Sequence, residues 1–232
     1  MSQQLKTTIQ QLNDEIEYVK KLEGMRKEFI ANFTHEIKTP LSIINGYIEL
    51  IEAGKDDLKK QQYLSAIHQE IEHINQLIMA MLDLSRLESG KVELHKEDID
   101  LEDLLMSIVE TFAPILKKKH IHVVMGDEFP HIQGDFKELK IVFQNFMSNA
   151  IKHTPQNGHI YIKYHQGILS FENEGKPLSH EQKETIWDTY VSSDRQGTGL
   201  GLAICRSILE LHGFQYDVCN SEKGVEFQIH IL

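Results

Sequence analysis

The sequence contains little proline and cysteine and no long apolar run. Five prolines among 232 residues leave no proline-rich or low-complexity linker. The longest apolar run, residues 77–82, is far shorter than the roughly 18 residues that a membrane-spanning helix needs. The first 20 residues are mainly polar and show no signal peptide. We therefore expect a soluble chain, and this expectation is compatible with a native membrane segment upstream of Met1.

A surplus of basic charge is also absent. The chain has 24 Lys and Arg against 35 Asp and Glu, a net charge of −11, and its one basic cluster is residues 117–119. A nucleic-acid-binding protein needs a cationic surface, so we expect no nucleic-acid partner. Cys205 and Cys219 form no CxxC pair and lie among apolar residues, which predicts two buried free thiols in a reducing compartment. Of the 13 histidines, His35 precedes a glutamate but lacks the second histidine of an HExxH motif, so we expect no histidine-based metal site.

Residues 1–90 show the apolar spacing of two long helices. Apolar residues alternate steps of three and four from Leu5 to Val19, and a second seam with a shifted phase begins at Leu22. No strong cap separates the seams, so we expect one helix of about 50 residues that ends near Gly54. A second helix is expected over residues 57–88. Because two amphipathic helices bury little surface alone, the hairpin should pair with a copy of itself as a four-helix bundle.

From residue 91 the pattern changes to short strands and helices. The order of these elements predicts a mainly antiparallel sheet with helices on one face. The expected fold class is therefore multidomain α and α+β, in which a helical hairpin forming a dimeric four-helix bundle is followed by an α/β sandwich. Strands are expected at residues 92–94, 121–125, 160–164, 168–171, 216–219 and 225–231, and helices at residues 101–118, 136–152, 180–189 and 200–212.

The segment around His35 is the first candidate for chemistry. His35 and Thr39 lie four residues apart and therefore share one helical face. Glu36 is placed to hydrogen-bond one nitrogen of the His35 ring, which would leave the other nitrogen nucleophilic. Pro40 removes a helical hydrogen bond and is expected to kink the helix beside His35. From the residues alone, a solvated histidine beside an accidental kink is the simpler interpretation.

A second candidate lies in a predicted helix of the second half. Asn145 and Asn149 share one face, and Lys152 follows three residues after Asn149. Two amide oxygens and an ammonium group that face one direction suit hydrated Mg²⁺ and a polyphosphate. The alternative is an amphipathic helix with a polar outer face, although asparagine is a poor helix former.

Two further segments carry weaker signals. Residues 197–203 form a glycine-rich stretch that opens a helix, where free N–H groups and close backbone approach favour phosphate binding. This stretch matches neither the dinucleotide-binding fingerprint nor a Walker loop. Residues 171–178 form a strand that runs into a turn, and alone they indicate an ordinary polar turn.

Taken in order, these four segments resemble the transmitter module of sensor histidine kinases of two-component systems. Residues 35–40 resemble the phosphoacceptor box of this family, and residues 145–154 resemble its asparagine box. Residues 197–203 resemble the glycine-rich segment that flanks its ATP lid. Gly134 and Asp135 also fit the usual residues ahead of the asparagine box, and the resemblance extends from about Met25 to the end of the chain.

The resemblance implies three parts of the chain. Residues 1–24 would be an N-terminal coiled-coil or signalling helix. Residues 25–90 would be the dimerisation and histidine phosphoacceptor domain, and residues 91–232 the catalytic ATP-binding domain of the Bergerat ATPase type. The native protein would then be membrane-tethered through an upstream segment, with this chain as its cytoplasmic portion.

The resemblance also implies a reaction. With ATP and Mg²⁺, His35 would accept the γ-phosphoryl group on Nε2, with Glu36 as its acid–base partner. The phosphoryl group would then pass to an aspartate on the receiver domain of a separate response regulator. Thr39 would orient a water molecule for the reverse, dephosphorylating activity. The implied partners are thus a second copy of the chain, as a homodimer through residues 1–90, and a response regulator.

The implied nucleotide site uses residues from three of the segments. Asn149 and Asn145 would hold Mg²⁺, Lys152 would reach a phosphate, and His153 would lie against the nucleotide. The other residues implied in nucleotide binding are Asn173, Gly175, Thr198, Gly199, Leu200 and Gly201.

The sequence departs from the family pattern in several places. Asn173 stands where the family usually has an adenine-binding Asp, and Pro177 replaces the second glycine of that motif, so we expect weaker nucleotide binding. Val191 replaces a frequent Arg, whose phosphate-binding role would either fall to Arg195 or be absent. These departures keep a second interpretation open, an ATP-incompetent dimeric phosphotransfer or phosphatase scaffold. A third interpretation, a non-kinase ATPase of the same superfamily, is opposed by the His35 box on a coiled-coil hairpin.

Overall fold

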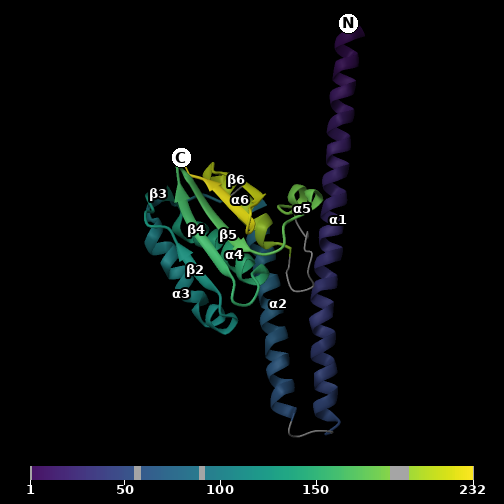
Figure 1. Ribbon diagram of the computed structural model, residues 1–232. Helices are drawn as coiled ribbons and strands as arrows, with labels where there is room; N and C mark the ends of the chain where they lie inside the picture. Colours follow the sequence, from purple (N-terminus) through teal and green to yellow (C-terminus); the bar gives the residue numbers. More distant parts are fainter. Residues whose placement is uncertain (1, 55–58, 89–91, 189–198, 232) are drawn as a thin grey trace. The chain divides into compact units, whose positions relative to one another are not determined.

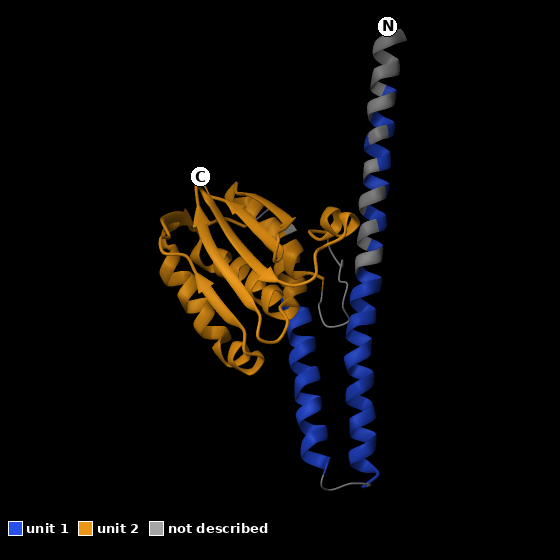
Figure 2. Cartoon of the chain, viewed as in Figure 1, with its two compact units in different colours: residues 1–79 blue, residues 80–232 orange. Residues whose placement is uncertain are grey.

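The computed structural model describes residues 2–54, 59–88, 92–188 and 199–231, apart from some side chains in the first 29 residues and that of Glu88 (Figure 1). The chain divides into two compact units, residues 1–79 and residues 80–232 (Figure 2). The boundary lies inside helix α2 (Lys60–Glu88), so the last turns of this helix belong to the second unit. Within the described ranges, no helix combines the length and the apolar character that crossing a membrane requires.

Helix α1 (Ser2–Glu52) is the first element of unit 1, and it stays helical on both sides of Pro40. The predicted single long helix is thus confirmed, and both apolar seams belong to one continuous element. Gly54, two residues after the last helical residue, terminates the helix: it has a left-handed φ of 62° and donates its N–H to the carbonyl of Ile51. Glycine is favoured at this position because a left-handed residue without a Cβ atom costs little.

Helix α2 returns beside α1 within unit 1. The rings of Tyr47 on α1 and Tyr63 on α2 stack with their centroids 5.5 Å apart. This contact joins the two helices near the turn, and it confirms the predicted antiparallel hairpin. The first residues of the predicted second helix, 57 and 58, lie outside the described residues.

Unit 2 contains an α/β sandwich with two sheets. The larger sheet has the strand order β2-β4-β5-β7-β6, in which β2 and β4 are parallel and the other neighbours are antiparallel. Helices α3, α4 and α6 lie on one face of this sheet, with α4 between the other two (Figure 1). The elements after α2 are β1 (Glu97–Asp100), α3 (Leu101–Lys119), β2 (His122–Met125), β3 (His131–Gly134), α4 (Phe136–His153), β4 (His159–His165), β5 (Ile168–Glu174), α5 (His180–Thr185), α6 (Gly201–His212), β6 (Gln215–Asn220) and β7 (Gly224–His230).

Helix α4 forms the centre of the core of unit 2. Phe143 and Phe146 on its inner face pack on Phe171 of β5, with ring centroids 6.0 Å and 5.6 Å apart. All three side chains are buried. Because the inner face of α4 is fixed in this way, its outer polar face has a defined direction, and that face carries the predicted asparagine pair.

The predicted strand at residues 92–94 is wrong. Val92 and Leu94 belong to no strand, and the first strand of unit 2, β1, begins at Glu97 and pairs with β3. Just before β1, the N–H of His95 donates to the carboxylate of Asp135 instead of a strand carbonyl. Val92 and Leu94 therefore have no neighbouring strand to pair with. Strand β3, which the sequence did not predict, pairs with residues 97–100 of β1 instead.

Two other expectations need correction. The predicted helix at residues 180–189 ends at Thr185 in α5, because Trp187 turns inward and packs on Phe146, with ring centroids 6.1 Å apart. Cys205 is buried as predicted, but Cys219 is only half-buried, and its thiol donates to the carboxylate of Glu226. The surroundings of Cys219 are therefore polar on one side.

Candidate functional site

The phosphoacceptor candidate lies on α1. His35 is exposed, and the hydroxyl of Thr39, one turn later, donates to the backbone carbonyl of His35 over 3.2 Å. Glu36 is half-buried; burial raises the pKa of its carboxyl above the ordinary value, and neighbouring His35 opposes this shift. No hydrogen bond joins the Glu36 carboxylate to the His35 ring among the described contacts. A carboxyl with a raised pKa beside a histidine is suited to accept and return a proton.

The asparagine pair lies on the outer side of α4. Asn145 and Asn149 are half-buried, and the amide nitrogen of Asn145 donates to the carbonyl of Ile141 over 2.9 Å. This bond turns the Asn145 oxygen towards α6. A Cβ atom on Gly201, the first residue of α6, would overlap this oxygen. The structure therefore brings the asparagine segment and the glycine-rich segment into direct contact.

The start of α6 is the described part of the glycine-rich segment. Gly199 has a left-handed φ of 61°, and Leu200 is buried and accepts the N–H of Ile204 through its carbonyl. The first N–H groups of a helix have no partner inside the helix, so this end of α6 is suited to a phosphate. Thr198, the predicted lid and the proposed role of Arg195 lie outside the described residues.

The predicted base-binding residues meet at the end of β5. Asn173 is only 3% exposed, and its amide nitrogen donates to the carbonyl of Glu174 over 3.2 Å. With its nitrogen engaged in this way, the Asn173 side chain keeps its oxygen as a hydrogen-bond acceptor. A Cβ atom on Gly175 would lie 2.9 Å from the carbonyl oxygen of His153, closer than side chains pack. Gly175 thus allows the end of β5 to approach the end of α4.

An open pocket of about 770 Å³ lies where these two ends meet. It brings together three predicted residues, Lys152, His153 and Gly175, with two lysines that the sequence did not indicate as site residues. Lys176 follows Gly175, and Lys223 lies in the β6–β7 turn with its ammonium 3.7 Å from the ring centroid of Tyr161. The lining residues are Lys152, His153, Thr154, Pro155, Glu174, Gly175, Lys176 and Lys223.

Helix α4 therefore connects the separate parts of the candidate site. Asn145 contacts the start of α6, and His153, about 12 Å further along the helix axis, lies beside Gly175. Asn149 stands between them. The arrangement offers amide oxygens for a hard cation, an ammonium group and a helix N-terminus for phosphates, and a buried amide oxygen for a base.

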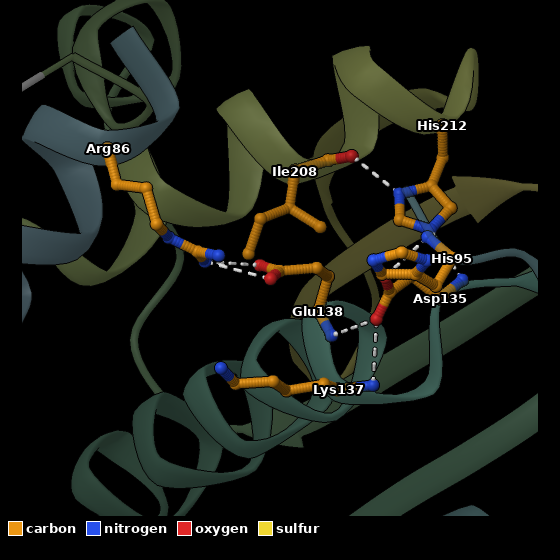
Figure 3. Close-up of polar contacts among 7 residues, drawn as sticks. All are labelled: Arg86, His95, Asp135, Lys137, Glu138, Ile208 and His212. Carbon is orange, nitrogen blue, oxygen red and sulfur yellow. Dashed lines mark hydrogen bonds and ion pairs between the residues drawn. The ribbon is translucent and has the colours of Figure 1, made fainter. Parts of the chain in front are cut away.

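A buried network that the sequence did not reveal fixes the first turn of α4 (Figure 3). The carboxylate of Asp135 accepts the N–H groups of Lys137, Glu138 and His95, at 3.1, 3.2 and 2.9 Å. Burial raises the pKa of Asp135, but these backbone bonds together lower it below the ordinary value. Asp135 is thus charged and holds the incoming chain against α4.

His212, the last residue of α6, completes this network. Its Nε2 accepts the N–H of Asp135 over 3.0 Å, and its Nδ1 lies 2.8 Å from the carbonyl oxygen of Ile208. The ring is therefore neutral, with the proton on Nδ1. Burial lowers the pKa of His212, in agreement with this tautomer. A Cβ atom on Gly134 would press on Leu139 and lie 3.5 Å from Nε2 of His212, which explains the small residue there.

Two family models match the chain. Residues 25–90 match the His Kinase A (phospho-acceptor) domain. Residues 134–232 match the Histidine kinase-, DNA gyrase B-, and HSP90-like ATPase model. The matched ranges contain His35 and the asparagine and glycine-rich segments, respectively.

Known proteins give the same result. The heme sensor protein HssS of Staphylococcus saprophyticus is 30% identical over 219 residues, which are 91% of this chain and 47% of that protein. The catalytic domain of histidine kinase ThkA is 31% identical, with a TM-score of 0.55, over 60% of this chain and 95% of that one. A crystal structure of ThkA in complex with the response regulator protein TrrA is 28% identical, with a TM-score of 0.72, over 88% of this chain and 60% of that one.

The chain spans about half the length, or less, of the curated relatives that it matches. The matches confirm the expected fold class, a helical hairpin followed by an α/β ATPase sandwich. The order of a phosphoacceptor helix and an ATPase domain is that of one protein family, and the chain belongs to it: the sensor histidine kinases of two-component systems.

Proposed function

We propose that this chain transfers the γ-phosphoryl group of ATP to its own His35 and then passes it to an aspartate of a response regulator. The observation that carries this proposal is the gathering of the predicted nucleotide-binding segments on α4. Asn145 lies against Gly201 and His153 lies against Gly175, although these partners are distant in the sequence. Such a convergence supports one ligand that extends along α4 from a phosphate end to a base end.

The chemistry at His35 follows from its exposure. Nε2 of the neutral ring attacks the γ-phosphorus, the N–P bond forms, and the bond to the bridging oxygen of ADP breaks. The proton on Nδ1 passes to Glu36, whose raised pKa makes its carboxylate a better base than an ordinary glutamate. Phosphoryl transfer depends mainly on positioning and charge neutralisation, which the ATPase domain supplies.

The residues on α4 fit a nucleotide with Mg²⁺. Asn149 and Asn145 would hold the metal ion through their oxygens, and the bond of the Asn145 amide nitrogen to Ile141 directs the Asn145 oxygen towards the start of α6. Bound Mg²⁺ would neutralise phosphate charge. Lys152 would contact a phosphate, and His153 would lie against the nucleoside.

Asn173 would accept a hydrogen bond from the adenine amino group through its oxygen, because its amide nitrogen is bound to Glu174. A neutral acceptor makes a weaker bond than the charged Asp usual in the family. This feature favours a second candidate function, a phosphotransfer or phosphatase scaffold that does not use ATP. In that case the wild-type chain would take up no label from ATP but would accept a phosphoryl group from a phosphorylated regulator.

We also infer a homodimer through residues 1–90. Large apolar side chains stay exposed along both helices of unit 1, and a single hairpin cannot bury them. They include Ile9, Leu12, Ile16, Val19, Ile30, Ile43, Ile48, Leu64 and Ile71. Light scattering at micromolar concentration should give twice the mass of 26.8 kDa, and a monomeric mass would contradict the inference.

A response regulator is the proposed partner, because the related kinase ThkA was solved in complex with the response regulator protein TrrA. Thr39 is the proposed residue for regulator dephosphorylation, since it lies one turn from His35 on the same helix. Attachment to a membrane and a cytoplasmic location stay predictions.

Incubation with γ-labelled ATP and Mg²⁺ tests the kinase function. We expect a label that is labile in acid and stable in alkali, and its loss in His35→Gln. The matched control is His68→Gln, an exposed histidine on α2, which should keep the label. Label that survives His35→Gln, or a wild-type chain without label, would show that the proposal is wrong.

A further inference from the structure

An ion pair connects the end of α2 to the start of α4 (Figure 3). One guanidinium nitrogen of Arg86 lies 2.8 Å and 3.0 Å from the two carboxylate oxygens of Glu138. The side chain of Glu138 is 4% exposed and that of Arg86 is 39% exposed. A carboxylate so deeply buried needs a charged partner, because removal of that partner leaves an uncompensated charge.

Both partners stand on well-fixed elements of unit 2. Glu138 lies in the first turn of α4, which Asp135 caps and joins to the chain before β1 and to α6. Arg86 lies in the last turn of α2, where neighbouring Leu84 and Leu87 are buried. The ion pair is thus a direct polar connection between α2 and α4, in addition to the burial of Leu84 and Leu87 and to the chain through residues 89–96.

The ion pair affects the angle between α2 and α4. Residues 92–96 form no helix or strand, so the covalent path alone does not fix the angle between α2 and α4. Glu138 and Asn149 lie on the same helix, about 16 Å apart along its axis. A rotation of α4 at its start therefore displaces the nucleotide-binding end by a distance that grows with this length.

We propose that Arg86 and Glu138 are positioning residues, whose ion pair fixes the direction of α4, and with it the bound nucleotide, relative to α2 for transfer to His35. The inference rests on the proposed kinase function. It assigns the pair no contact with ATP or with the reacting atoms. Loss of the pair should therefore lower the rate of transfer and leave nucleotide affinity unchanged.

The test compares Arg86→Glu, Glu138→Arg and the double variant that restores the pair with exchanged charges. At saturating ATP, each single variant should autophosphorylate roughly 10-fold to 100-fold more slowly, since small displacements of reacting groups cost this much. Nucleotide affinity, measured by calorimetry, should stay within about twofold, and the double variant should recover most of the rate. Arg86→Lys, which keeps the charge but loses the guanidinium, should fall between.

Lys137→Glu is the matched control, because it reverses a charge one residue earlier on α4 with an exposed side chain. It should autophosphorylate like the wild type. Because Glu138→Arg places a buried cation and risks misfolding, Arg86→Gln supplies a second way to open the pair from its exposed side. Trypsin should cut the chain between α2 and β1 faster in Arg86→Gln than in the wild type, and the exchanged pair should restore the wild-type rate.

The outcomes separate this inference from the proposed function. Wild-type chain without label would overturn the kinase function, and the positioning role with it. Label in the wild type, with single variants that keep its rate or with no recovery in a folded double variant, would overturn the positioning role alone. Single variants that lose nucleotide affinity in proportion to rate would also overturn it, since the pair would then only stabilise the fold.

Discussion

Gly201 and Asn145 are in direct contact, and a Cβ atom on Gly201 would overlap the Asn145 carboxamide oxygen. The contact sets the separation between the start of α6 and the middle of α4. Asn145 cannot turn away freely, because its amide nitrogen is bound to the carbonyl of Ile141. The two segments that the sequence associates with phosphates and Mg²⁺ therefore form one surface.

Gly201→Ala should damage this surface. The added methyl group forces α6 or Asn145 to move, which should destabilise the ATPase domain by about 1–3 kcal/mol and lower nucleotide affinity. Urea unfolding and calorimetric nucleotide binding measure the two effects. Gly46→Ala is the control, since no atom lies within 4 Å of a Cβ atom there. Nucleotide binding unchanged in Gly201→Ala would mean that this contact lies outside the site.

Asn149→Ala should abolish autophosphorylation almost completely, because it removes the central oxygen ligand proposed for Mg²⁺. The measurement is uptake of γ-label, together with nucleotide affinity with and without Mg²⁺. The wild type should bind ATP more tightly with Mg²⁺, and the variant should show little difference. Ser148→Ala, an exposed neighbour on the same helix, should behave like the wild type. A normal label in Asn149→Ala would refute the metal assignment.

Thr39→Ala should separate the two proposed activities of the helix. Among the residues that the structure describes, the Thr39 hydroxyl bonds to the backbone of His35 alone, so its loss should leave α1 and autophosphorylation largely intact. Dephosphorylation of the regulator should slow, as measured by release of phosphate from the phosphorylated receiver domain. Thr34→Ala removes an equivalent bond, to Ile30 at 2.7 Å, and should leave both activities unchanged. An unaltered phosphatase rate in Thr39→Ala would remove its proposed role.

His212 should make the ATPase domain less stable in mild acid. Burial lowers the pKa of this histidine in the folded state, and in the unfolded chain it returns to about 6.5. The unfolded state therefore binds the proton more tightly. The contribution of His212 to the free energy of unfolding is at its maximum above pH 6.5. It decreases as the pH drops towards the folded pKa, by at most about 1.4 kcal/mol per pH unit. Urea unfolding between pH 5 and 7.5 measures this slope.

In His212→Gln the slope in this range should become flatter, although the variant is less stable overall. Asp135, whose folded pKa lies below its ordinary value of 3.8, changes stability only at lower pH, so the two groups are distinguishable. An equal slope in both proteins would assign the effect to another group.

The sequence predicted the helices and most strands because their signals are local. The apolar seam changes phase at Leu22, but no strong cap separates the two seams, and this lack of a stop signal correctly predicted the single helix α1. The strands predicted at residues 160–164 and 168–171 do pair as a hairpin, and its turn residues, Gln166 and Gly167, adopt left-handed φ values of 49° and 85°.

The errors concern elements whose partners lie far away in the chain. Val92 and Leu94 alternate like a strand, but the N–H of His95 finds its acceptor in Asp135 instead. Strand β3 exists because Gly134 and its neighbours pair with Glu97 and the residues after it, and nothing in residues 131–134 alone indicates a strand.

The candidate site was predicted as separate segments, and the structure adds their contacts. The order of the segments indicated which residues are candidates for nucleotide binding. It could not show that Gly175 lies against His153 or that Lys223 borders the same pocket. Arg86 and Glu138 gave no signal at all, because a surface arginine and a glutamate in a first helical turn are both common. Arg86 and Glu138 are 52 residues apart in the sequence, and only the packing of α2 against α4 brings them together.

Because α1 is one continuous helix, the number of residues before His35 determines the direction in which His35 points around the helix axis. Each residue turns the helix by about 100°, so a single residue inserted near Gly24 would move His35 to a different side of the bundle relative to the apolar seam before it. Seven residues would return it to within about 20° of its original direction. The length of the segment before His35 therefore also sets the rotational phase of the histidine. Insertions or deletions of whole heptads should keep this phase, whereas other lengths should change it.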